Sequence, residues 1–150
     1  GVSINNNNLF NLHQYANQEL ENIDFGINVY NVDFVREAKD IDIDKIIIDL
    51  SKYDYIWGQN NPEALIYISN IFIRNTDVQI IGKNKDTVKF EKNGIVYIKF
   101  HAKSIIEQLN QYDEMRLNIV GKANLNQWMG RKVPQIFIED LEVFNSEFDF

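Results

Sequence analysis

Cationic residues are concentrated in one part of the sequence, residues 65–135. This segment holds 11 of the 15 Lys and Arg residues against 6 Asp and Glu, whereas residues 1–64 and 136–150 carry net charges of −7 and −5. A basic segment that also contains aromatic residues is suited to binding a polyanion. A solvated lysine surface would give the same count, so charge alone leaves both interpretations open.

Catalytic and metal-binding chemistry find little support in the residue types. The sequence has no cysteine and only two histidines, His13 and His101, so no disulfide framework and no cysteine or histidine metal site is expected. The acidic residues Asp42, Asp44 and Asp49 gather in one stretch, where a helix cap and a solvated helix face account for them better than a metal site. We therefore predict no catalytic and no metal-binding residue in this chain.

The cations lie on segments with the alternation of β-strands. Residues 65–81 predict one long strand, with a bend or a turn at Asn75-Thr76-Asp77. Residues 87–91 and 95–102 flank Lys92-Asn93-Gly94, and an Asn-Gly pair between alternating runs is the strongest short-range hairpin signal.

The remaining segments complete a small barrel. Ser104 followed by Glu107 has the form of a capping box and predicts a short helix. Residues 116–125 and 133–144 predict two last strands, joined by a loop over residues 127–132. This order predicts an all-β barrel of the oligonucleotide/oligosaccharide-binding (OB) kind, with five strands and one short helix between strands 3 and 4.

Alternation along the predicted hairpin assigns its side chains to two faces. The face expected in the barrel core carries Val88, Phe90, Val96, Ile98 and Phe100. The outward face carries Lys89, Glu91, Tyr97, Lys99 and His101. The outward face thus combines cations with an aromatic ring.

The residues before the barrel predict an α+β segment. Apolar residues spaced by three and four predict an amphipathic helix over residues 9–23, and residues 27–34 predict a strand. Residues 42–50 predict a second helix that Asp42 caps. One strand between two helices needs a sheet to join, so we expect the rest of that sheet upstream of this chain.

These patterns give a domain organisation in three parts. Residues 1–56 are predicted to be the C-terminal part of an α+β domain, residues 57–64 a connector, and residues 65–150 an OB-fold domain. No apolar run approaches the roughly 20 residues that span a bilayer, and no leader typical of a signal peptide is present, so the cytoplasm is the expected compartment.

Two motifs resemble those of a known family. Residues 57–63 read Trp-Gly-Gln-Asn-Asn-Pro-Glu, and they are similar to the connector that precedes the OB domain of the RecJ-type single-stranded-DNA-specific exonucleases. The family pattern near the end of the OB domain is Asn-x-Trp-x-Gly, then Pro-Gln, then Ile-x-Asp. Here it is matched by Asn126, Trp128, Gly130, Pro134, Gln135, Ile138 and Asp140.

The resemblance implies a larger parent enzyme. In that family a DHH-type phosphoesterase domain and a DHH-associated domain, to which residues 1–56 would belong, precede the OB domain. The metal-ligand motifs have no counterpart in this chain, so the fragment alone is predicted to be inactive. The resemblance further implies Mn²⁺ or Mg²⁺ in the parent, 5′→3′ digestion, and a role in DNA repair and recombination.

Single-stranded DNA is the implied ligand, with the upstream nuclease core and a single-strand-binding protein as further candidate partners. Proteins of this kind combine aromatic platforms for bases with a basic groove for phosphates. We predict that Tyr97 and Trp128 stack on bases. The residues predicted to meet phosphates are Lys89, Lys99, Lys122, Arg131 and Lys132. The alternative is an interaction module that docks a protein partner or the nuclease core without touching DNA.

Overall fold

The computed structural model describes residues 29–58 and 60–146. Two compact units divide the chain, residues 1–30 and residues 31–150, and nearly all described residues belong to the second. The helix predicted over residues 9–23 lies outside the described residues.

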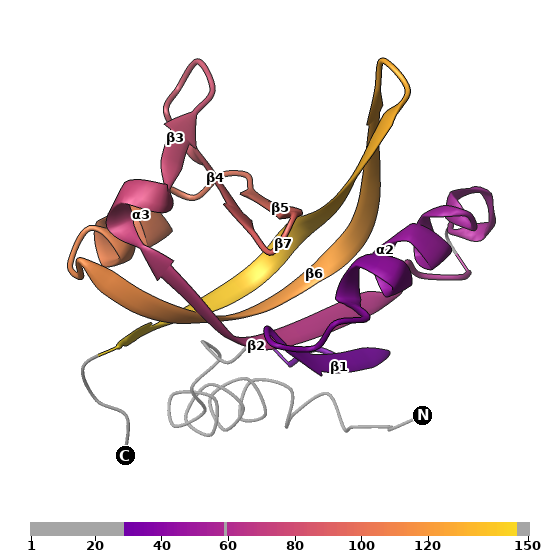
Figure 1. The fold of residues 1–150 in the computed structure, drawn as a ribbon, viewed down its shortest axis with the longest axis horizontal. Helices are drawn as coiled ribbons and strands as arrows, with labels where there is room; N and C mark the ends of the chain where they lie inside the picture. The colour runs from indigo at the N-terminus through magenta and orange to yellow at the C-terminus, as the bar shows by residue number, and fades with distance from the viewer. Residues whose placement is uncertain (1–28, 59, 147–150) are drawn as a thin grey trace, which may run out of the picture. The chain divides into compact units, whose positions relative to one another are not determined.

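Strands dominate the described part of the chain, with few helices (Figure 1). In chain order the elements are β1 (Phe34–Glu37), α2 (Ile43–Ser51), the 3-10 helix η2 (Asp54–Ile56), β2 (Leu65–Arg74), the 3-10 helix η3 (Asn75–Asp77), β3 (Gln79–Ile81), β4 (Thr87–Lys92), β5 (Ile95–Lys99), α3 (Lys103–Leu109), β6 (Glu114–Trp128) and β7 (Arg131–Asn145).

The strands form a single sheet in the order β1-β2-β6-β7-β5-β4-β3. β2 pairs with β6, while β3, which follows β2 after η3, pairs with β4 at the far end of the sheet. The consecutive strands β2 and β3 thereby lie near opposite ends of the strand order, and the sheet curls back on itself (Figure 1). This is the mostly β, OB-like fold that the sequence predicts, with the expected bend at η3.

Among the described residues the sheet has seven strands, whereas the sequence predicts five in the barrel and one before it. The first predicted barrel strand is divided into β2 and β3, and β1 pairs in parallel with β2. The strand predicted at residues 27–34 is misplaced, because residues 29–33 are not in a strand and β1 begins at Phe34. Within this chain β1 therefore extends the sheet of the barrel.

The helix predicted over residues 42–50 is confirmed as α2, which buries Ile43 and Ile47 in the same core as the barrel strands. The predicted cap is wrong, because the Asp42 side chain makes no cap hydrogen bond. Its carboxylate instead accepts a hydrogen bond of 3.1 Å from Arg36 Nε. The guanidinium thus occupies the acceptor that the helix amides would use.

The short helix predicted after the third barrel strand is confirmed as α3. It begins at Lys103 after Ala102, and no side-chain hydrogen bond caps it. Ser104 lies inside the first turn, so the capping box predicted from Ser104 and Glu107 is wrong. Burial of Leu109 in the barrel core anchors this helix instead.

A bulge lets β2 bury isoleucines of both parities: Ile66, Ile68, Ile71 and Ile73. The register with β6 shifts between Ile68 and Ile71, which turns the second half of the strand over by one residue. Asn70 occupies the irregular position with a φ of 60°, a conformation that asparagine tolerates better than most residues.

Candidate nucleic-acid interface

The β4–β5 hairpin turns through two residues, Asn93 and Gly94, whose φ angles are 52° and 77°. Positive φ at both positions is the geometry of a type I′ turn, which places Lys92 opposite Ile95. The sequence-based prediction counts Lys92 as a third loop residue. That miscount slips the register by one residue and exchanges the two faces of β5.

Tyr97 therefore faces the interior of the barrel. Its side chain is 2% exposed, and its ring stacks on Phe90 with a centroid distance of 4.8 Å and an interplanar angle of 12°. Burial raises the pKa of the Tyr97 hydroxyl. The prediction that Tyr97 and Lys99 lie on the outer face is wrong. Lys99 pairs with the buried Val88, and the buried ring of Tyr97 is not available to stack on a base.

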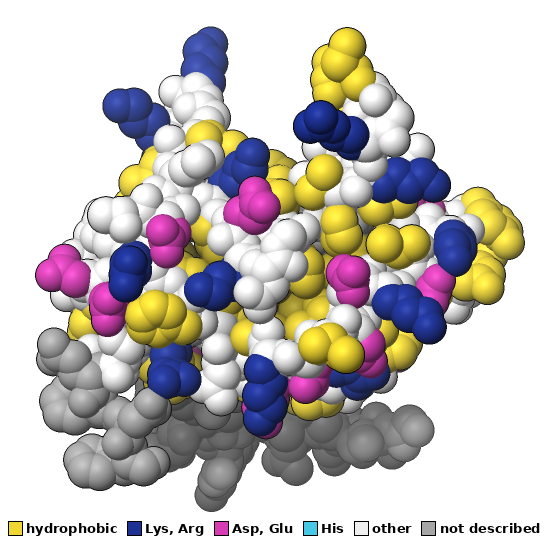
Figure 2. All heavy atoms as spheres, in the orientation of Figure 1, with side chains coloured by type: hydrophobic (Ala, Val, Ile, Leu, Met, Phe, Trp, Pro, Cys, Tyr) yellow, Lys and Arg dark blue, Asp and Glu magenta, His cyan; other side chains and the backbone are white. Residues whose placement is uncertain are grey.

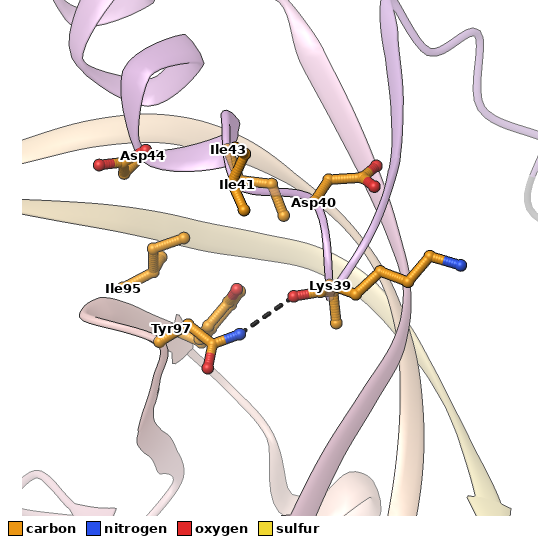
Figure 3. Close-up of a pocket in the computed structure, with 9 residues that line it drawn as sticks. Lys39, Asp40, Ile41, Ile43, Asp44, Ile95 and Tyr97 are labelled. Atoms are coloured by element: carbon orange, nitrogen blue, oxygen red, sulfur yellow. Dashed lines mark hydrogen bonds between the residues drawn. The ribbon is translucent and has the colours of Figure 1, made fainter.

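A small pocket separates this hairpin from the start of α2. Ile95 and Tyr97 face Ile43 across a volume of about 280 Å³ (Figure 3). At its edge, Asn93 Nδ2 donates a hydrogen bond of 3.0 Å to the carbonyl oxygen of Ala38. This contact fastens the β4–β5 turn to the loop between β1 and α2.

The β6–β7 hairpin is a longer ribbon than predicted. β6 continues to Trp128 and β7 begins at Arg131, so a two-residue turn replaces the loop predicted over residues 127–132. Met129 and Gly130 form this turn with φ angles of 48° and 79°. The ribbon projects from the barrel (Figure 1), and the Trp128 side chain at its end is 72% exposed.

The two sides of this ribbon carry different candidate residues. Trp128 pairs with Arg131, and the next pair is Gln127 with Lys132. Because successive pairs of a ladder point to opposite faces, Trp128 and Arg131 share one face and Lys132 lies on the other. Lys132 therefore lies on the opposite side of the ribbon from Trp128, and its contact with a phosphate stays a prediction.

A row of paired residues crosses the outside of the barrel. Lys89 pairs with Ile98, Ile98 with Phe137, and Phe137 with Lys122. Directly opposite residues share a face of the sheet, so these four side chains form what we call the outer row. The same face of β7 continues to Arg131, and that of β6 to Trp128.

Glu139 engages two of the predicted phosphate contacts. Lys99 Nζ donates a hydrogen bond of 2.7 Å to the Glu139 carbonyl oxygen. Lys122 Nζ lies 2.8 Å from the Glu139 carboxylate and 3.9 Å from that of Glu63, and the hydrogen bond with Glu139 raises the pKa of Lys122. Burial in turn raises the pKa of Glu63. These two lysines therefore have acceptors within the chain.

Two projections flank the outer row. We call the β3–β4 hairpin (residues 79–88) the first arm and the β6–β7 ribbon (residues 123–136) the second arm. The loop of the first arm exposes Lys83 and Lys85. Figure 2 shows cations at the end of the first arm, apolar side chains and cations on the second, and a hollow between them, which we call the groove.

Several cations of the two arms and the outer row have no ion pair with any residue that the structure describes. They are Lys83, Lys85, Lys89, Arg131 and Lys132. Their positive charge is not neutralised within that part of the chain. The groove thus offers positive charge on both walls and on the outer row between them.

Sequence reasoning misses two aromatic residues at the groove. The alternation assigns Phe100 to the core, yet it is 49% exposed and packs against Phe137 of the outer row. The corrected register would have shown part of this, since it places Ile98 and not Tyr97 on the outer face.

Other functional features are sparse in residues 29–58 and 60–146. Within them, no three His, Cys, Asp or Glu side chains come close enough together to hold a metal ion. No helix there combines the length and apolarity needed to cross a membrane.

The sequence of the chain matches a known protein family. Residues 32–140 match the family described as the RecJ OB domain. The matched range includes β1 and α2 as well as the barrel.

Curated relatives are longer proteins. The chain is 33% identical over 150 residues to a Bacillus subtilis protein named as a putative SPbeta prophage-derived single-strand DNA-specific exonuclease, YorK, covering 98% of this chain and 26% of YorK. It is 31% identical over 138 residues to the single-stranded-DNA-specific exonuclease RecJ of B. subtilis, covering 88% of this chain and 16% of that protein. The chain thus spans about a quarter or less of these relatives.

A solved structure also matches in part. It is the crystal structure of RecJ in complex with Mn²⁺ from Thermus thermophilus, with a TM-score of 0.42 and 19% identity. The match covers 57% of this chain and 12% of that one.

Proposed function

The chain belongs to the RecJ OB domain family, and on that premise we propose that it is the C-terminal, single-stranded-DNA-binding portion of a RecJ-like exonuclease. The relatives that match nearly all of this chain are named as single-strand-DNA-specific exonucleases. Because the chain covers only part of them, hydrolysis belongs to the remainder of the parent in this proposal.

One observation carries the proposed DNA contact, the convergence of charge and an exposed indole on one face. Lys89 lies on the outer row, and Trp128 and Arg131 continue the same face along the second arm. An indole accepts any base by stacking, and the cations attract phosphates without reading sequence. We therefore propose that a single strand lies in the groove and crosses the outer row.

Within this proposal the predicted contacts have unequal roles. Lys89 and Arg131 are the primary phosphate contacts, together with Lys83 and Lys85 of the first arm. Lys99 and Lys122 contribute less, because Glu139 already engages both. Lys132 supports binding through long-range attraction from the far side of the second arm.

Chemistry in the parent is proposed to lie upstream. A divalent metal, Mn²⁺ or Mg²⁺, would activate water for phosphodiester hydrolysis there. No cluster of three metal-ligand side chains exists among the described residues, so no step is assigned to them. The assignment of residues 1–56 to a DHH-associated domain, the 5′→3′ polarity, the repair role, the cytoplasmic location and a single-strand-binding protein as partner all stay predictions.

A binding titration tests the proposal. The 150-residue chain is mixed with a fluorescein-labelled oligothymidylate of about 16 nucleotides, the upper end of an OB-fold footprint. Fluorescence anisotropy is followed at about 50 and 200 mM salt. On single strands, the logarithm of the binding constant falls with the logarithm of the salt concentration by about 0.7 for each phosphate contact.

Charge reversals identify the face that binds. Lys89→Glu and Arg131→Glu are expected to weaken binding and to flatten the salt dependence. Lys45 is an exposed cation on α2, and Lys45→Glu should leave the affinity and its salt dependence unchanged within error. Absence of binding by the unmodified chain at the lower salt concentration would overturn the proposal and favour the interaction module.

A further inference from the structure

The aromatic pair Phe100 and Phe137 lies where the outer row meets the end of β5. We infer that Phe100, backed by Phe137, is a base-stacking platform for a single-stranded nucleic acid. The inference rests on the proposed function, since it names the side chain that receives a base in the groove.

The geometry of the pair leaves part of one ring available. The ring centroids of Phe100 and Phe137 are 5.6 Å apart and the planes are inclined by 56°. Phe137 is half-buried within β7, whereas Phe100 is 49% exposed. The inner ring therefore supports the outer one, as a platform requires.

A sharp turn explains why Phe100 does not enter the core. His101 has a φ of 53°, and the next residue, Ala102, is fully buried. The Ala102 amide N–H donates a hydrogen bond of 2.7 Å to the carbonyl oxygen of Asp86, the last residue of the loop of the first arm. The backbone on the C-terminal side of Phe100 is thus fixed, which limits the entropy lost when a ligand contacts the ring.

The surroundings of Phe100 favour a polyanion over an uncharged partner. Phe137, which Phe100 contacts, pairs with Ile98, and Ile98 pairs with Lys89. Lys89 has no ion pair with the described residues. A base on Phe100 would place its phosphates near this cation, which combines stacking with charge as in other single-strand binders.

The platform and Trp128 lie at opposite sides of the groove. Phe100 is two residues before Ala102, which bonds to Asp86 in the loop of the first arm, and Trp128 is at the end of the second arm. A strand that lies along the groove would therefore place different bases on the two rings. The buried Tyr97 is therefore replaced by Phe100 as the second ring that contacts DNA.

The test compares two exposed phenylalanines. Phe100→Ala is matched with Phe144→Ala, since Phe144 is 45% exposed near the other end of β7. Phe100→Ala is expected to weaken binding of labelled oligothymidylate by roughly 5- to 150-fold, the range for one stacked base, and Phe100→Trp to restore it. Phe144→Ala should bind like the unmodified chain.

A strand without bases separates stacking from other effects. On an abasic oligonucleotide of equal length, the unmodified chain and Phe100→Ala are expected to bind equally, with unchanged salt dependence. If the unmodified chain binds oligothymidylate but Phe100→Ala binds as tightly, the platform is overturned and the proposed function stands. If the unmodified chain binds neither strand, both are overturned.

Measurements of thermal unfolding show whether Phe100→Ala weakens binding only because it destabilises the fold. Thermal unfolding of Phe100→Ala is compared with that of Phe144→Ala by circular dichroism. A large loss of stability in Phe100→Ala that accompanies equal weakening on both strands would show that Phe100 only packs on Phe137, and would overturn the inference.

Discussion

Two hairpins in this barrel have the same kind of turn, but one is packed against the rest of the chain and the other projects from it. The β4–β5 and β6–β7 hairpins both turn through two residues with positive φ, Asn93-Gly94 and Met129-Gly130. The first turn is fastened to Ala38 by a hydrogen bond, and the ring that follows it, Tyr97, is buried. The second projects, and its Met129 side chain is 88% exposed.

The difference between the two hairpins shows that a turn determines which residues pair across the strands, but not whether their side chains are buried. In both hairpins the two-residue turn fixes which residues are opposite each other, and hence which side chains share a face. Whether a face is covered depends on what else packs there. The loop before α2 packs on the first hairpin, while no described element covers the end of the second.

The largest expected effect is on the free energy of unfolding, in which the rings of Tyr97 and Trp128 should differ. Tyr97→Ala removes a fully buried ring that stacks on Phe90, and is expected to destabilise the chain by about 3 to 5 kcal/mol, as for other buried aromatic truncations. Urea unfolding followed by circular dichroism measures this. Tyr97→Phe, which keeps the ring, should stay within about 1 kcal/mol, and a minor loss in Tyr97→Ala would contradict the assigned burial.

Trp128→Ala should show the converse pattern. The exposed indole contributes little to folding, so unfolding should change by less than about 0.5 kcal/mol. Binding of labelled oligothymidylate should weaken by about 1 to 3 kcal/mol through the lost stacking. Met129→Ala, at the adjacent and still more exposed position, is the control, and equal losses in both variants would argue against a specific role for the indole.

The sequence predicts the order of elements well because that order rests on local signals. The Asn93-Gly94 pair, the apolar spacing of α2 and the alternation of the last strands each act over a few residues. The faces of β5 are also within reach of sequence reasoning, because a type I′ turn admits two loop residues and Lys92 belongs to the strand.

Other features depend on contacts that no local pattern contains. The exposure of Phe100 depends in part on the turn at His101, after which the Ala102 amide N–H donates a hydrogen bond to the carbonyl oxygen of Asp86. Asp42 fails as a cap because Arg36 approaches it across the β1–α2 loop. The ion pair between Lys122 and Glu139 depends on the register of β6 on β7. That register could not be derived from the sequence, because the predicted loop over residues 127–132 is longer than the actual two-residue turn.

Glycine substitutions sharpen the comparison of the turns. Gly94 and Gly130 have nearly equal φ angles of 77° and 79°, and no atom lies within 4 Å of a Cβ added to either. Alanine should therefore cost about 1 to 2 kcal/mol of local strain at each. We expect Gly94→Ala to lose that amount in global unfolding, because its turn sets Ile95 and Tyr97 in the core.

Gly130→Ala should be tolerated better in global unfolding. Its turn joins the exposed end of the second arm, where the strands can fray without opening the core. Hydrogen exchange should instead show faster opening of amides near Trp128. Equal losses of global stability in the two variants would mean that the second arm unfolds together with the barrel, and that the proposed contrast is absent.

The smallest expected effect concerns the charge at the base of the second arm. Glu139→Gln removes the carboxylate that lies 2.8 Å from Lys122 Nζ, so this cation becomes more available to a phosphate. Since exposed ion pairs contribute about 0.2 to 1 kcal/mol, affinity for oligothymidylate should rise roughly 1.5- to 5-fold. Glu142→Gln on the same strand changes the net charge equally and is the matched control. A rise confined to Glu139→Gln would show that Lys122 belongs to the groove and is restrained there, whereas equal rises would reflect net charge alone.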